Sequence, residues 1–190
     1  MSARQPAAII IAIVACLAGC ATPGSIGGTD YAPEYDYSEF YAVANGKTFR
    51  VEVSGNPFPA LSQEEVERRL LPVMQANKPQ PDLTFTYAKP AEEPRPDYRL
   101  MMVFNPANDL TAARVCAGQI RHKPRPTRPF DLFAVYCRND LALSQSTAWT
   151  PATGPEDPRV GQLLGHLFNV LFNPFERPQP PPFPFIILRK

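Results

Sequence analysis

Few residues of this chain have both the type and the spacing that chemistry requires. The two histidines, His122 and His166, lie far apart in the sequence, and the carboxylates are scattered rather than paired. The sequence contains no nucleophile elbow, no glycine-rich phosphate loop and no H-E-x-x-H pair. We therefore predict that the protein is not an enzyme, that it needs no cofactor and that it holds no metal ion.

The strongest signal for chemistry comes from a cysteine near the start of the chain. Cys20 directly follows Leu17, Ala18 and Gly19, and this quartet closes an apolar run that is preceded by Arg4. A basic start, an apolar core and small residues before a cut make up a secretory signal. The run is too short to span a bilayer, which takes about 20 apolar residues.

The quartet Leu17-Ala18-Gly19-Cys20 resembles the lipobox of bacterial lipoproteins. That resemblance implies cleavage after residue 19 and attachment of diacylglyceryl and palmitate-type acyl chains to Cys20. Two or three such chains make membrane attachment effectively permanent. Ala21, in place of an aspartate, resembles lipoproteins that are sorted to the outer membrane of Gram-negative bacteria. The implied location is the outer membrane, with the domain facing the periplasm.

Two further cysteines, Cys116 and Cys137, belong to the mature domain. Because an exported chain meets an oxidising compartment, two such thiols usually pair. We predict a disulfide between them, and the alternative is a pair of buried free thiols. Their separation lacks the spacing of zinc ligands.

The one local charge anomaly is a run of basic residues in a loop: Arg121, His122, Lys123, Arg125 and Arg128. Because the arginine side chain presents a fork that suits phosphate or carboxylate, this run is a candidate anion-binding loop. The alternative is a solvated loop kept extended by its own charges. The formal net charge of the whole chain is only +1, so we expect no nucleic-acid partner.

Proline divides the chain into elements and connections. The 24 prolines concentrate in residues 72–96, 124–129, 151–158 and 174–184. Because proline lacks an amide donor and fixes φ, we predict that these segments are loops or extended spacers. Gly and Pro are also frequent before residue 37, which predicts a flexible tether there. The predicted parts are a signal peptide over 1–19, a tether over 20–37, a single domain over 38–175 and a Pro-rich tail over 176–190.

Alternating apolar residues predict the strands. Asn45-Gly46 is a typical hairpin turn, which predicts a hairpin over 40–53. Further strands are expected over 83–87 and 98–104, and a second hairpin over 130–149. Residues 108–116 fit a short helix or a strand.

Two amphipathic helices complete the predicted fold. Ser62 and Glu65 form a capping box, and the helix that follows is expected to bend or stop at Pro72. A closing helix begins after the capping residue Asp157 and ends at Asn173. The sequence therefore predicts an α+β fold with a mainly antiparallel sheet of about five to six strands and the two helices on one face.

The expected function is that of a non-enzymatic binding or assembly module, anchored at the periplasmic face of the outer membrane through acylated Cys20. Its partner would be an envelope protein or an anionic lipid or glycan. The order of elements is similar to that of small periplasmic lipoproteins of the lipopolysaccharide-assembly type, which implies an accessory role in lipid or lipopolysaccharide transport as an alternative. An envelope hydrolase without a recognisable motif is a third hypothesis. The apolar residues 185–188 of the tail are expected either to return to the sheet as an edge strand or to dock on a partner or the membrane interface.

Overall fold

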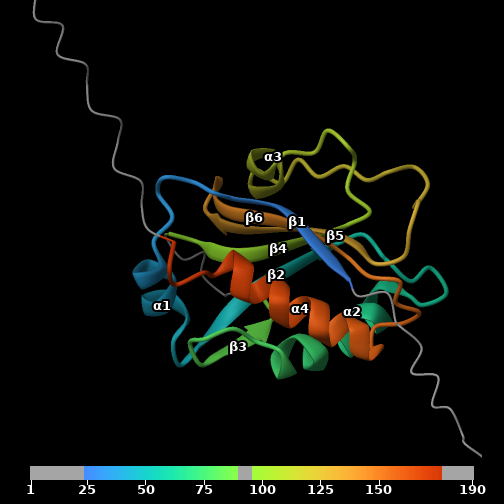
Figure 1. Ribbon diagram of the computed structural model, residues 1–190, viewed down its shortest axis with the longest axis horizontal. Coiled ribbons are helices and arrows are strands. Elements are labelled where there is room, and N and C mark those ends of the chain that lie inside the picture. The colour runs from blue at the N-terminus through green and yellow to red at the C-terminus, as the bar shows by residue number, and fades with distance from the viewer. Residues whose placement is uncertain (1–23, 90–95, 177–190) are drawn as a thin grey trace, which may run out of the picture.

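A computed structural model describes residues 24–89 and 96–176, which form an α+β fold. The strands are β1 (Ser25–Tyr31), β2 (Lys47–Ser54), β3 (Leu83–Thr86), β4 (Tyr98–Phe104), β5 (Asp131–Arg138) and β6 (Leu141–Trp149). The helices are α1 (Tyr37–Ala44), α2 (Gln63–Ala76), α3 (Ala112–Cys116) and α4 (Pro158–Leu171). The strands form one six-stranded sheet in the order β1-β6-β5-β4-β2-β3 (Figure 1).

The sheet is mixed, so the prediction of a mainly antiparallel sheet is wrong. Strands β1, β6, β5 and β4 pair antiparallel in succession, whereas β2 runs parallel to both β3 and β4. Helix α2 connects β2 to β3, as a crossover between parallel strands requires. The predicted elements at 83–87, 98–104 and 130–149 and the closing helix are confirmed as β3, β4, the β5–β6 hairpin and α4.

The predicted first hairpin is also wrong, because its first strand is helix α1. The side chain of Asp36 caps this helix by accepting a hydrogen bond from the Ser38 amide at 2.8 Å. Phe40 and Ala44 are buried one helical turn apart. The apolar sequence over 40–44 fits both the strand and the helix period, and burial of the two residues four apart selects the helix. Gly46, with φ of 70°, then turns the chain into β2.

The predicted tether does not hold from residue 25 onward. Residues 25–31 form β1 along the outer side of β6, and the aromatic residues that follow are packed into the domain. Tyr35 is buried, and its hydroxyl donates a hydrogen bond to the carbonyl of Asn173 at 3.0 Å. Because β1 is exposed along most of its length, its sequence lacks the apolar alternation that predicts a strand.

Helix α2 continues through Pro72, where a bend or stop was expected. The cap is as predicted, since Ser62 accepts a hydrogen bond from the amide of Glu65 at 3.2 Å. Pro72 lies on the exposed side of the helix. The opposite side buries Val66, Leu70 and Met74, and this packing keeps the helix continuous.

Both edges of the sheet are protected against further strand pairing. Gln75 of α2 lies beside the outer edge of β3, where its side-chain amide donates to the carbonyl of Leu83 at 2.9 Å and accepts from the amide of Phe85 at 2.8 Å. The Gln75 amide thus takes the place of a neighbouring peptide group. At the other edge, a bulge interrupts the register of β1 between Gly27 and Asp30.

Two hydrophobic clusters lie on the two sides of the sheet. The larger contains the buried residues of α1, α2 and α4, and the smaller contains those of α3 together with Met101 and Val103 of β4. Figure 1 shows α3 on one side of the sheet and the other helices on the opposite side. The disulfide between Cys116 and Cys137 is confirmed and fastens α3 to β5.

Candidate functional site

The basic run is largely engaged by carboxylates of the same domain. Arg121 pairs with Asp109 at 2.5 Å. Lys123 and Arg128 both pair with the buried Asp131, at 2.8 and 3.3 Å. Among the described residues Arg125 forms no ion pair, and it is exposed. This run is therefore a surface segment held in place by ion pairs, and its charges do not converge on a pocket.

His122 has a structural position inside this run. Its Nδ1 lies 2.8 Å from the carbonyl oxygen of Phe104, and its Nε2 lies 3.1 Å from the hydroxyl of Ser54. Gly55, with φ of 83°, passes so close that a Cβ there would lie 2.9 Å from the imidazole ring. Because both ring nitrogens are occupied, His122 fastens the loop to β2. His166, the other histidine, is exposed on α4.

A better candidate site lies where α1 meets the starts of β2 and β4, and we call it the Tyr98 cleft. It consists of two cavities of about 590 and 350 Å³ that share Thr48 and Tyr98. Val43 and Phe49 form an apolar wall in the larger cavity, and Glu39 and Lys47 add charged groups. The smaller cavity is lined by Thr48, Arg50, Thr86, Ala88, Lys89, Asp97 and Tyr98. A mostly apolar wall with a few converging polar groups is typical of a binding site.

Glu39 organises one side of the cleft. The Tyr98 hydroxyl donates a hydrogen bond to Glu39, and one guanidinium nitrogen of Arg138 lies 2.9 Å from each carboxylate oxygen. Burial, and next the hydrogen bond to Glu39, raise the pKa of Tyr98 to about 12. The hydrogen bond that Arg138 donates to Glu39 likewise raises the pKa of Arg138. Tyr98 therefore stays protonated at neutral pH, and this trio fixes donors in place rather than exchanging protons.

Arg50 and Arg99 organise the other side. Asp97 accepts from both, with an oxygen 3.3 Å from Arg50 and 2.8 Å from Arg99. Arg99 also donates to the carbonyl of Cys116 at 2.6 Å, which ties this cluster to the disulfide. The Nε of Arg50 is buried and has no hydrogen-bond acceptor among the described residues. Because buried donors nearly always find acceptors, this N–H is an exception among the polar groups of the cluster.

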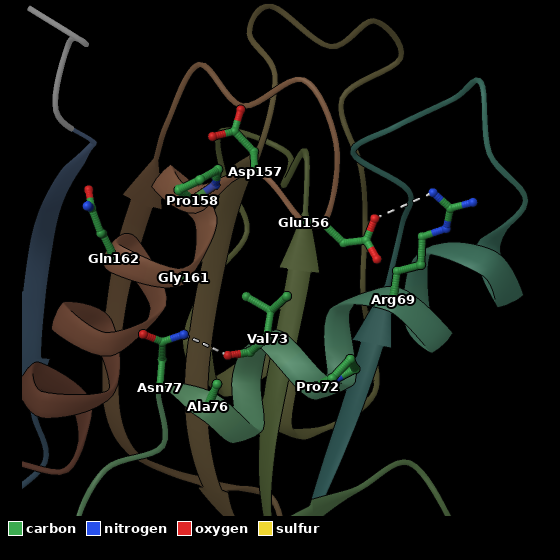
Figure 2. A pocket seen from close by; sticks show the side chains of 10 residues that line it. All are labelled: Arg69, Pro72, Val73, Ala76, Asn77, Glu156, Asp157, Pro158, Gly161 and Gln162. Carbon is green, nitrogen blue, oxygen red and sulfur yellow. Dashed lines mark hydrogen bonds and ion pairs between the residues drawn. The ribbon is translucent and has the colours of Figure 1, made fainter. Parts of the chain in front are cut away.

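A second depression lies between α2 and the start of α4 (Figure 2). It consists of two cavities of about 440 and 610 Å³ that share Arg69, Glu156, Asp157 and Pro158. Figure 2 shows Arg69 and Glu156 pointing toward one another across it, at 3.7 Å. Asp157 caps α4, and its hydrogen bonds to Arg159 hold the pKa of its carboxyl well below its usual range. The charged groups of this depression pair with one another or cap α4, so they are already engaged within the domain. We therefore favour the Tyr98 cleft as the candidate site.

The Tyr98 cleft was not foreseen from the sequence. Glu39 is separated by 59 residues from Tyr98 and by 99 from Arg138, and no local motif marks any of the three. Within residues 24–89 and 96–176 no group of three or more His, Cys, Asp or Glu side chains could hold a metal ion. In the same described part, no helix has the length and apolar character needed to cross a bilayer.

Three predicted features, the signal peptide over 1–19, Cys20 and the tail from residue 177 onward, lie outside the described residues. Comparison of the chain with protein-family models, with curated proteins and with solved structures found no match.

Proposed function

We propose that this protein is a lipid-anchored lipoprotein of the bacterial envelope whose domain binds a partner protein at the periplasmic face of the outer membrane. The quartet Leu17-Ala18-Gly19-Cys20 supports the anchor. The disulfide between Cys116 and Cys137 supports export, because such bonds persist in oxidising compartments.

The observation that carries the binding role is the Tyr98 cleft. Its ionisable groups are held in ion pairs and hydrogen bonds, which favours recognition over proton transfer. Lys47 is exposed at the larger cavity, whose apolar wall is Val43 and Phe49, and Lys89 is exposed at the smaller cavity. This combination suits a protein segment in which an acidic side chain lies next to apolar ones.

The anchor is tested by replacing Cys20 with serine in the full-length chain. Because only the cysteine thiol accepts the diacylglyceryl group in lipoproteins, we expect complete loss of acyl labelling and accumulation of the uncleaved precursor. Cys16→Ser is the matched control, since it removes a thiol four residues earlier in the same apolar run. Acyl labelling and intact-protein mass spectrometry measure both effects. Normal cleavage and labelling of the Cys20→Ser protein would show that it is not a lipoprotein.

The binding role is tested by reversing the charges at the rim of the cleft. With Lys47→Glu and Lys89→Glu combined, an acidic partner segment would meet like charge, and we expect about tenfold lower recovery of partner after cross-linking in intact envelopes. Arg114→Glu, an exposed cation on α3, is the control. Equal partner recovery from wild type, control and the double variant would exclude the cleft as the binding site.

A further inference from the structure

We propose that the end of the sheet at Gly24 lies against the lipid headgroups, and that the basic segment 121–128 contacts anionic lipid there. This inference rests on the proposed acylation of Cys20. It assigns an orientation to the anchored domain, with one end of the strands on the membrane and the Tyr98 cleft at the other end.

The number of residues between Cys20 and the folded domain limits how far this end of the sheet can lie from the membrane. Only three residues separate Cys20 from Gly24, so the two Cα atoms can be at most about 14 Å apart. A tether extending to residue 37 would have allowed about 60 Å. Gly24 is itself held tightly, because a Cβ there would lie 2.8 Å from both a Leu163 methyl carbon and the Trp149 carbonyl oxygen. An acylated Cys20 would therefore hold the start of β1 close to the membrane.

The strand register shows which residues share this end of the sheet. Ser25 of β1 lies opposite Trp149, the last residue of β6, and Trp149 lies opposite Asp131, the first residue of β5. The basic segment 121–128 leads into Asp131 and is therefore at the same end. In Figure 1 this end is on the right, where β1 begins and the long loop after α3 returns to β5. Tyr98 begins β4 opposite Arg138, the last residue of β5, so the cleft is at the other end.

The charge of this end suits an anionic surface. Segment 121–128 contains the four cations Arg121, Lys123, Arg125 and Arg128, which meet two carboxylates, Asp109 and Asp131. The side chains of Arg121 and Arg128 are 50 % and 48 % exposed. On the helix side of the same end, Arg69 lies near both Glu65 and Glu156, and Arg159 pairs with Asp157, so that side has no positive surplus. Segment 121–128 and its two carboxylate partners keep a surplus of two positive charges, as attraction to anionic headgroups requires.

The distance that the short connection allows is of the same order as the range of electrostatic attraction to the membrane. At physiological ionic strength exposed charges act over a Debye length of about 8 Å. An anchor that ended at residue 37 would leave these cations beyond that range for most of the time. Because Gly24 stays within about 14 Å of Cys20, less than two Debye lengths, the short connection lets these cations come within range of the headgroups, where their attraction to anionic lipid then holds them.

Trp149 gives a direct measurement of this contact. It is the only tryptophan of the chain, and the guanidinium carbon of Arg128 lies 5.6 Å from the centre of its ring. Full-length acylated protein would be placed in phosphatidylcholine vesicles with or without phosphatidylglycerol, each with and without a lipid that carries a nitroxide quencher on its headgroup. We expect the nitroxide lipid to quench the fluorescence of Trp149, and to quench it more strongly in the vesicles that contain phosphatidylglycerol.

The variant Arg121→Glu with Arg125→Glu leaves Arg128 and Trp149 in place. Because each cation near an anionic surface adds to the attraction, we expect its quenching in anionic vesicles to fall at least about twofold. The control, Arg114→Glu with Lys78→Glu, changes the net charge equally but lies away from Gly24 and is expected to keep wild-type quenching.

The outcomes separate this inference from the proposed function. Absence of Trp149 quenching in acylated, vesicle-bound wild type, or equal quenching in both double variants, overturns the orientation and leaves the lipoprotein assignment standing. A wild-type protein that mass spectrometry shows to be unacylated overturns both. Quenching that depends on Arg121 and Arg125 and on anionic lipid supports the inference.

Discussion

Replacement of Phe40 by alanine is expected to destabilise the domain by about 3 to 5 kcal/mol, the usual cost of deleting a fully buried phenyl ring. Phe40 of α1 has no exposed surface, and its ring stacks on that of Phe172 with centroids 4.0 Å apart. The Phe49 ring meets it edge-on at 5.5 Å. Phe40 thus joins α1, β2 and the end of α4 in one aromatic cluster. Urea unfolding followed by circular dichroism measures the free energy of unfolding.

Neighbouring residues of α1 provide the controls for this prediction. Tyr41 is 47 % exposed, and Tyr41→Ala is expected to change stability by no more than about 0.5 kcal/mol. A second pair distinguishes the helix from the hairpin that the sequence suggested. Ala44 is buried and Ala42 is exposed, so Ala44→Glu should disrupt folding while Ala42→Glu should be tolerated. The opposite result would mean that this segment is a strand with Ala42 facing inward.

Removal of the disulfide by Cys116→Ser with Cys137→Ser is expected to cost about 3 kcal/mol, because the bond restricts an unfolded loop of this length. The two cysteines are 21 residues apart. The bond also holds α3 over Met101 and Val103, in a small cluster with few other contacts to the core. Urea unfolding with and without a reductant measures the effect. Reductant should lower the stability of the wild type to that of the double variant and leave the double variant unchanged.

Alkylation in denaturant and without reductant, applied to protein isolated from intact cells, checks the bond itself, because denaturation exposes both buried cysteines to the reagent. Mass spectrometry should find neither Cys116 nor Cys137 modified. Two fully alkylated thiols would establish the alternative of free buried cysteines. Equal stability of wild type and double variant, with the bond present, would show that α3 is held by packing alone.

The elements that could be predicted from the sequence are those whose signals are local. The caps at Ser62 and Asp157 marked the starts of α2 and α4, and alternating apolar residues marked β3. The α+β class followed from the mixture of such elements. The disulfide could be predicted because the expected export of the chain predicts that two thiols of one domain pair.

The errors arose where tertiary contacts decided between two local possibilities. Residues 40–44 fit either a strand or a helix, and packing against Phe172 selected the helix. Because residues 40–44 form a helix and not a strand, β2 has no hairpin partner and pairs in parallel with β3 and β4. The basic run was visible in the sequence, whereas its pairing with Asp109 and Asp131 depends on the path of the loop. The Tyr98 cleft joins distant positions and had no signal of its own.

If the chain is anchored as proposed, the amide of Gln75 at the edge of β3 has a further consequence. Molecules confined to a plane meet at a high effective concentration and in similar orientations, so even weak pairing between exposed strand edges would be amplified by crowding. Because Gln75 occupies the carbonyl of Leu83 and the amide of Phe85, a neighbouring copy finds no free ladder there. With the bulge of β1 at the other edge, edge-to-edge pairing between anchored copies would be disfavoured at both edges of the sheet.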